Sequence, residues 1–292
     1  MAIDIMIEQK LFGRKNMPLE VILGEGLNYG NFENDMLNIG ELGGNEFLAY
    51  NPEKIGRGFS VIWTPEEKRR LYLRLPLPST AQELKDLYCA VERMVSYWGG
   101  KLTLDGNRVS LSEFLDGYDE MVEFNYRVVR HLSSQILDGD QETLTLYSAK
   151  WPITLGKEEA EIFLNEPERF DEWLHEKQNM DVFFASPDMY NGENGIFGRF
   201  FITEELPAIF PNEPTVPFGL TDPETGKALE CKNWCIAVGF HDEKRPITEM
   251  EYSDFLNSIP EEKKTKYDAN HFLLEALTKE EIKMICETKR KQ

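Results

Sequence analysis

Cys231 and Cys235, with His241 nearby, are the residues whose types and spacing best suit metal chemistry. They fall in residues 231–240, whose pattern predicts a central β-strand. Residues i and i+4 of a strand share one face but lie roughly 13 Å apart, too far to share one metal ion. Free cysteine is also a common small buried hydrophobe. We therefore predict that this pair binds no metal.

Two acidic patterns resemble metal sites without completing them. Asp138, Asp140 and Glu142 match the start of a calcium loop, but Thr143 stands where the loop needs glycine and the distal glutamate is absent. Glu172 and His175 have the i, i+3 spacing of di-metal helix bundles, which require a second such pair and further glutamates. A solvated acidic helix face explains this pair better. The sequence thus predicts no metal site and no cofactor.

Motifs for nucleophilic, phosphoryl-transfer or metalloprotease chemistry are absent from the sequence. His131 belongs to a predicted helix beside Arg130 and is expected to be exposed, and His271 is expected to pack at a strand edge. The 52 acidic side chains make chance carboxylate pairs inevitable. No catalytic residue is predicted, and a protein that is not an enzyme is favoured.

The charge distribution restricts the class of partner. The net charge is −20, and residues 151–250 hold eight basic and twenty acidic residues, whereas residues 51–100 carry a net charge of +2. A negative field repels phosphate backbones and anionic lipid headgroups, so nucleic acid and membrane surfaces are poor partners. The acidic half serves solubility or, as a more specific hypothesis, docks a basic partner protein.

The subcellular location is predicted from the lack of a membrane helix, a signal peptide and a disulfide scaffold in the sequence. No apolar run approaches the roughly 20 residues of a membrane helix, and the N-terminus lacks the basic and apolar regions of a signal peptide. Four cysteines in 292 residues do not form a disulfide scaffold. A cytoplasmic protein is expected.

The elements that position these residues begin with the segment 56–100. Alternating apolar residues predict two strands, at 59–63 and 71–75, joined by a turn at 64–67. A helix follows from about residue 80 to Trp98, with a capping box at its start, and Gly99-Gly100 ends it. Trp98 completes its apolar stripe and is predicted to be buried.

The remaining pattern predicts the α+β class, with antiparallel sheets backed by helices. Two sub-domains are expected, 1–140 and 141–292, with a single continuous domain as the alternative. The expected strands and helices are: strands 2–8, 19–23, 47–50, 102–104, 143–147, 151–155, 182–185 and 196–203, the last two paired; loops or short turns over 24–45; helices 110–136, 157–178 (interrupted at Pro167) and 250–256; and a terminal helix from Thr278.

The segment 204–229 contains five prolines, which are expected to exclude a regular helix or central strand. It also contains large apolar side chains that disordered linkers lack. Ordered loops of this length either wrap a core or contact a ligand or partner. We predict wrapping with the Phe210 ring in the core, and keep Phe210 and Phe218 as candidate binding residues.

Three short motifs carry a resemblance to a known family: Gly56-Arg57-Gly58-Phe59, the junction Leu75–Ser79, and Leu206-Pro207-Ala208-Ile209-Phe210-Pro211. Through them the chain resembles, over nearly its full length, an uncharacterised family of cytoplasmic bacterial proteins known as domain of unknown function 4299. The resemblance implies no known activity and no known catalytic residues.

Two functional hypotheses follow. The favoured one is a non-catalytic cytosolic protein that acts through protein–protein contacts. The alternative is an enzyme or small-ligand binder whose pocket lies under the Pro-rich segment 204–229. A deep cleft with converging polar groups would favour the second hypothesis, and a flat acidic surface the first.

Overall fold

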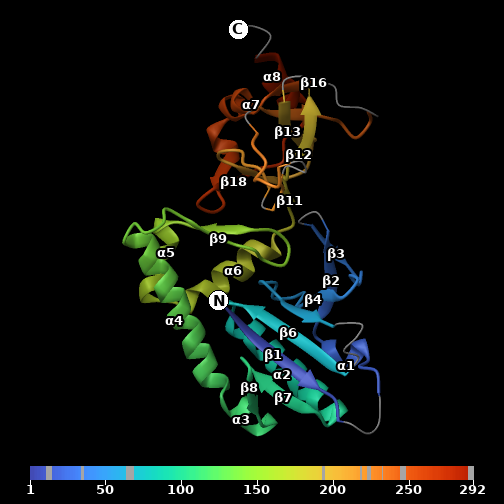
Figure 1. Cartoon of the computed structure of the whole chain (residues 1–292). Helices are drawn as coiled ribbons and strands as arrows, with labels where there is room; N and C mark the ends of the chain where they lie inside the picture. The colour runs from blue at the N-terminus through green and yellow to red at the C-terminus, as the bar shows by residue number, and fades with distance from the viewer. Residues whose placement is uncertain are drawn as a thin grey trace. The chain divides into compact units, whose positions relative to one another are not determined.

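The computed structural model describes residues 1–10, 15–33, 36–63, 69–192, 195–217, 219–221, 225–231, 233–243 and 248–288. The chain forms two compact units, Met1–Met180 (unit 1) and Asp181–Gln292 (unit 2). Sheets and helices follow one another in runs rather than in strict alternation, so the expected α+β class is confirmed (Figure 1).

Unit 1 is built on an eight-stranded sheet in which every neighbouring pair is antiparallel. The expected pairing of the two strands of segment 56–100 is confirmed, while their turn, 64–67, lies outside the described residues. In sheet order, the strands are β3 (Met36–Ile39), β2 (Asn28–Glu33), β4 (Glu46–Tyr50), β5 (Phe59–Ile62), β6 (Arg70–Pro76), β1 (Ala2–Glu8), β7 (Lys101–Leu104) and β8 (Asn107–Val109).

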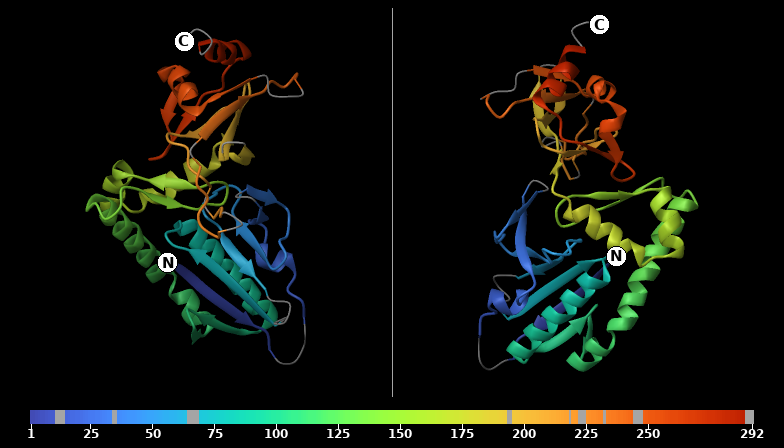
Figure 2. Two further views of the ribbon diagram at one scale, coloured as in Figure 1. Left: turned by 45° about the horizontal axis from the view of Figure 1, so that its top comes forward. Right: turned by 180° about the vertical axis from the view of Figure 1, so that it is seen from behind.

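The helix α2 (Ala81–Trp98) lies along one face of this sheet (Figure 2). The predicted capping box is present, since the Thr80 hydroxyl accepts from the Glu83 backbone N–H and the Glu83 carboxylate accepts from that of Thr80. Gly99 ends the helix in the left-handed conformation. Trp98 is buried, as predicted.

Further helices and one hairpin complete unit 1. The two short strands expected at 143–147 and 151–155 pair as a small hairpin before the last two helices, and Pro167 falls between those helices as predicted. These elements are α1 (Leu19–Leu23), α3 (Leu111–Asp116), α4 (Tyr118–Leu137), β9 (Leu144–Leu146), β10 (Ile153–Leu155), α5 (Lys157–Asn165) and α6 (Arg169–Asn179).

Three predictions for unit 1 were wrong. Leu19–Leu23 is a short helix, because Pro18 precedes it and a single turn is enough to bury Ile22 and Leu23. Residues 24–45 contain the hairpin β2–β3, whose half-exposed position at the sheet edge weakens the apolar alternation. The single helix expected over 110–136 is interrupted at Gly117, which separates α3 from α4.

The boundary expected at residue 140 falls inside unit 1. Hydrogen bonds cross it, because the Arg57 Nε donates to the Tyr147 carbonyl (3.0 Å) and the Ala149 backbone N–H donates to the Gly56 carbonyl (2.8 Å). Farther along, the Ala81 backbone N–H donates to Asp171 Oδ2 (2.9 Å). The hairpin β9–β10 and the helix α6 are thereby tied to the N-terminal sheet.

The described residues of unit 2 form two four-stranded sheets and two α-helices. The sheets are mixed, because β11 pairs parallel with β14 and β13 pairs parallel with β15, whereas only antiparallel pairing was expected. The first sheet is β11 (Phe183–Phe184), β14 (Ala208–Pro211), β18 (His271–Leu274) and β17 (Lys264–Lys266); the second is β12 (Asp188–Gly192), β13 (Gly195–Ile202), β15 (Asn233–Val238) and β16 (Thr248–Glu251); α7 (Tyr252–Ser258), a 3₁₀ turn (Glu261–Lys263) and α8 (Lys279–Thr288) complete the unit.

The strand assignments in unit 2 were predicted only in part. The expected pairing of 182–185 with 196–203 was wrong: β13 pairs with β12, and β11 belongs to the other sheet. Thr248–Glu251 is a strand rather than the beginning of a helix. His271 opens β18, which lies between two strands and not at a sheet edge. The central position of β15 and the terminal helix α8 are confirmed.

The Pro-rich segment contains a strand with partners on both sides, β14, which the prolines were expected to exclude. Pro207 precedes this strand and Pro211 ends it, so no interior N–H is lost from the ladder. Phe210 is fully buried, with its ring centroid 5.4 Å from that of Phe255. The predicted core position of Phe210 is therefore confirmed, while Phe218 lies outside the described residues.

Candidate functional site

The sheet β12-β13-β15-β16 has one face in the core of unit 2 and one face turned away from it. Side chains alternate along a strand, and Phe200, Ile202, Ile236 and Met250 are buried in the core. Their sequence neighbours therefore project from the opposite side, which we call the outer face. It carries Tyr190, Phe197, Arg199, Phe201, Asn233, Cys235, Glu249 and Glu251, matched across the strands by the pairing register.

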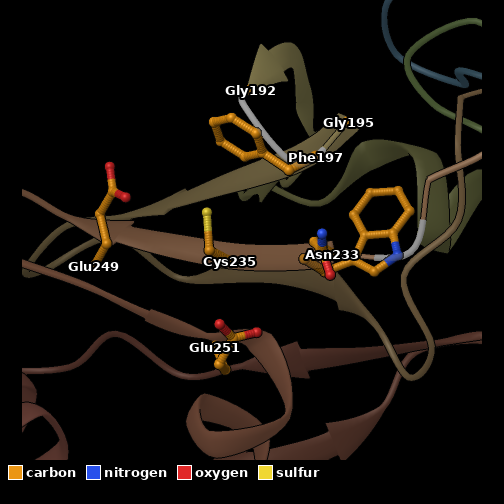
Figure 3. Close-up of a pocket in the computed structure, with 8 residues that line it drawn as sticks. Gly192, Gly195, Phe197, Asn233, Cys235, Glu249 and Glu251 are labelled. Carbon is orange, nitrogen blue, oxygen red and sulfur yellow. The ribbon is translucent and has the colours of Figure 1, made fainter.

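An open depression of about 430 Å³ lies on this side of the sheet. Figure 3 shows Phe197, Cys235 and Glu249 projecting to the same side of the ribbon. Trp234 also borders the depression, but its side chain alternates with that of Cys235 and lies on the core side of the sheet, where its ring covers Gly198 and its centroid lies 6.0 Å from that of Phe200. The lining residues are Gly192, Gly195, Phe197, Asn233, Trp234, Cys235, Glu249 and Glu251.

Arg199 organises one side of the outer face. Its Nη2 lies 2.8 Å from Glu249 Oε1, and its guanidinium lies 4.6 Å from the centroid of the Tyr190 ring. The Tyr190 and Phe197 rings are stacked with centroids 5.4 Å apart. Arg199 therefore combines an ion pair with cation–π contacts, an arrangement in which a planar guanidinium is more effective than an ammonium.

Glu251 forms no ion pair like that of Glu249 with Arg199 among the described residues. It is exposed and pairs across the strands with Cys235. Within the described parts of the chain, no lysine or arginine lies within 4.0 Å of its carboxylate. The depression therefore holds one carboxylate neutralised by Arg199 and a second without such a counter-ion among the described residues.

Cys235 is poorly suited to nucleophilic chemistry. Burial raises the pKa of its thiol, and the carboxylates of Glu249 and Glu251 act in the same direction, against a hydrogen bond with Arg199. The thiol is therefore protonated at neutral pH, whereas the thiolate is the nucleophile and metal ligand. Cys231 lies before β15, and its Sγ contacts the Asn233 carbonyl at 3.3 Å.

The residues singled out in the sequence are dispersed over the structure. Phe210 does not line the depression, nor does any other described residue of 204–229. Glu172 borders a smaller depression of about 200 Å³ between α5 and α6, and His175 Nδ1 lies 3.0 Å from the Ile55 carbonyl. The described residues contain no group of three or more His, Cys, Asp or Glu side chains placed to hold a metal ion.

A second polar cluster surrounds the N-terminus of α2 in unit 1. The loop 56–58 presents the backbone N–H groups of Arg57 and Gly58 to the buried Glu83 carboxylate, which accepts from both. Gly58 has a φ of +70°, and a Cβ on Gly56 would lie 2.5 Å from that carboxylate. The first motif of the family resemblance is thus an anion-binding loop that the protein's own Glu83 fills.

The titration of this cluster is shifted by burial. Burial raises the pKa of Glu83 and lowers that of Arg57 to about 10, although the two charges favour each other. Burial also raises the pKa of Asp171 to about 6, against hydrogen bonds from the Ala81 N–H and the Tyr126 hydroxyl. Asp171 Oδ1 is buried without a hydrogen-bond partner among the described residues. Since these groups mainly connect α2 to neighbouring elements, the cluster is structural.

The outer face is not recognisable from the alternation of residues along its strands. The run Phe197 to Ile202 carries large apolar side chains on both sides of the strand, so period-two alternation does not separate its faces. The signal in the sequence is the excess of large apolar side chains over what one buried face needs. In the structure Phe200 and Ile202 fill the core face, and Phe201 is left 45% exposed on the other face. An arginine between two outward-facing phenylalanines is a second indication of a binding surface.

No helix in the described part of the chain is long and apolar enough to cross a membrane. A family model described as "Domain of unknown function (DUF4299)" matches residues 2–285. No curated protein and no solved structure matches the chain.

Proposed function

We propose that this chain, which belongs to the family described as a domain of unknown function (DUF4299), is a non-catalytic cytosolic protein that binds a basic partner protein. The proposed docking surface is the outer face of unit 2. It combines exposed aromatic rings with carboxylates around an open depression of about 430 Å³.

The outer face supports this proposal through its composition. Tyr190 and Phe201 are 38% and 45% exposed on one side of a single sheet. Aromatic residues and arginine are enriched at protein interfaces, where the rings supply buried area and fix orientation. Because Arg199 neutralises Glu249, Glu251 gives the described part of the depression a negative charge, in agreement with the net charge of −20 of the chain. A partner of opposite charge fits this surface best.

The chemistry of the lining also favours binding over catalysis. The raised pKa of Cys235 disfavours its thiolate, and no histidine lines the depression that could act as a general base. Among the described residues, the remaining polar side chains of the lining are an amide and two carboxylates, which suit recognition of a cation.

A small organic cation is the second candidate ligand. The volume of about 430 Å³ falls within the range of about 300–1,000 Å³ that small-molecule sites occupy. Such a ligand would bind to the same residues without needing Phe201, which lies on the outer face but does not line the depression.

The proposal is tested by purifying the tagged full-length chain from its native cytosol at low and at moderate salt. We compare the wild type with Phe201→Gln, which removes an exposed ring from the outer face. The matched control is Phe183→Gln, which removes a 40% exposed ring from β11 of the other sheet.

We expect a basic protein that co-purifies with the wild type and with Phe183→Gln, is reduced with Phe201→Gln, and dissociates as salt rises. A bound protein retained equally by all three chains would contradict docking at the outer face. Loss of binding only when a small organic cation is added would favour the second candidate.

A further inference from the structure

We infer that the eight-stranded sheet of unit 1 joins two copies of this chain, packed face to face about a two-fold axis that runs parallel to the strands between β1 and β6. This inference is independent of the docking proposed for unit 2. It follows from the order of the side chains across the face of the sheet that points away from α2, which we call the open face.

Alternation along the strands separates the open face from the core face. The three isoleucines of β1 are buried in the core of unit 1 together with residues of α1, α2, α3 and α4, so these helices pack on the core face. Figure 1 shows α2 behind β1 and β6, and the right panel of Figure 2 shows it in front of them. Asp4 and Met6 alternate with the isoleucines and therefore project from the open face. The side chains of Asp4 and its cross-strand neighbour Arg74 are 56% and 60% exposed.

One row of side chains crosses the open face from an acidic end to a basic end. The pairing register places its members opposite one another on six consecutive strands, β4, β5, β6, β1, β7 and β8. The two charged ends are exposed, and the four residues between them are half-buried. In order, the row is Glu46, Ile62, Tyr72, Met6, Thr103 and Arg108.

A two-fold axis through the middle of this row makes the open face complementary to itself. The axis exchanges the two ends of the row, so Glu46 of each copy lies opposite Arg108 of the other. By the same operation the Tyr72 ring lies opposite Met6 of the second copy, a contact that a thioether makes favourably. Sheets pack face to face about 10 Å apart with their strands nearly aligned, which is the geometry that this axis requires.

The charged residues on either side of the row obey the same symmetry. Within one chain, Arg74 lies 3.6 Å from Asp4, and Arg70 lies 3.5 Å from Glu8. Each of these ion pairs joins β6 to β1, the two strands that the axis exchanges. The second copy therefore places an acid opposite every one of these arginines and an arginine opposite every acid. A partner with charges of a single sign would meet like charges at half of these positions, so a second copy fits the open face best.

Charge reversal at the two ends of the row tests this symmetry. Glu46→Lys alone places two cations together at both ends of the dimer, and Arg108→Glu alone places two anions there. The double variant restores opposite charges. An equimolar mixture of the two single variants does so as well, because each copy then meets the charge opposite to its own. The control is Glu92→Lys, the same change at an exposed position of α2.

Sedimentation velocity of the full-length chain over a series of protein concentrations, with a reducing agent present, gives the dissociation constant of the dimer. Circular dichroism melts verify that each variant is folded. We expect the wild type and Glu92→Lys to dimerise alike, and each single variant to raise the dissociation constant about tenfold or more. The double variant and the mixture should return to within about threefold of the wild-type value.

Three results would overturn the inference. A wild-type chain that stays monomeric at every concentration would leave the open face to a different partner. A dimer that both single variants leave unchanged forms through another surface. A dimer that the single variants weaken, but that neither the double variant nor the mixture restores, does not bring Glu46 and Arg108 together across a two-fold axis. Since none of these results involves Phe201→Gln, docking at the outer face of unit 2 is judged separately.

Discussion

Individual buried carboxylates decide how the N-terminus of α2 is held. Glu83 satisfies the backbone donors of Thr80, Arg57 and Gly58 at once, so one side chain caps a helix and closes a loop. Asp171 reaches the same helix end from α6 and accepts from the Ala81 N–H. A helix N-terminus favours negative charge, yet burial raises the pKa of both carboxyls.

Asp171 should make the protein more stable in mild acid. Its folded pKa of about 6 exceeds the usual value of 3.8, so the folded state binds more protons between these limits. The contribution of Asp171 to the free energy of unfolding therefore falls as pH rises from about 4 to 6 and stays low above that, a change on the order of 2 kcal/mol.

The measurement is urea unfolding at a series of pH values for the wild type and Asp171→Asn. The stability difference between the two should change between about pH 4 and pH 6 and be constant at higher pH. Asp119→Asn, at an exposed position of α4, serves as the control. If the free energies of unfolding of the wild type and Asp171→Asn differ by the same amount at every pH, the assigned environment of Asp171 is wrong.

At the scale of elements, α2 and its flanking strands form the core of unit 1. Trp98 closes the apolar stripe of this helix, and its Nε1 donates to the Lys15 carbonyl at 3.1 Å. Trp98→Ala is expected to lower the free energy of unfolding by about 3–5 kcal/mol, because a large buried side chain is replaced by a cavity.

The neighbouring Tyr97 provides the control for this prediction. It is 37% exposed, with the Lys15 ammonium 5.4 Å from its ring centroid. Tyr97→Ala should cost less than about 1 kcal/mol in the same denaturant melts. Similar losses for Trp98→Ala and Tyr97→Ala would mean that the stripe does not form the core.

The strand β14 anchors the Pro-rich segment. Phe210→Ala should cost about 3–5 kcal/mol, since the ring is fully buried among other aromatic residues. Phe201→Ala, on the exposed face of β13, should cost far less. Partner binding should follow the folded fraction in Phe210→Ala, and a stable Phe210→Ala variant that loses its partner would instead make Phe210 a recognition residue.

How far the sequence predicts the structure depends on whether the signal is local. Capping boxes and one-sided stripes identify α2 and α8 because their determinants lie within a few residues. The strand β14 was not predicted because its prolines were expected to exclude a central strand. Proline disrupts a strand only at a position whose backbone N–H must donate to a neighbouring strand, and Pro207 and Pro211 lie just before the strand and at its last residue. The outer face was missed because its residues meet only through the register of four strands.

At the scale of the whole molecule, contacts from residues 147–171 back to the N-terminal sheet define where unit 1 ends. A chain ending at residue 140 loses the bonds to Tyr147, Ala149 and Asp171, each worth about 1 kcal/mol. We expect it to be less stable than a chain ending at residue 180 by at least about 3 kcal/mol.

Thermal melts followed by circular dichroism compare these two chains directly. The longer chain should melt cooperatively, and the shorter one at a lower temperature or without a cooperative transition. If both chains melt alike, residues 1–140 form a self-sufficient domain and the earlier boundary is the better one.

Gly56 and Glu83 cannot vary independently in evolution. A side chain at position 56 would collide with the Glu83 carboxylate, because a Cβ there would lie 2.5 Å from it. Loss of Glu83 alone would leave the N–H groups of Arg57 and Gly58 buried without an acceptor. Members of the family should therefore keep both residues or exchange both together, so these two distant positions should co-vary, and a relative with a bulky residue at 56 should also lack the glutamate.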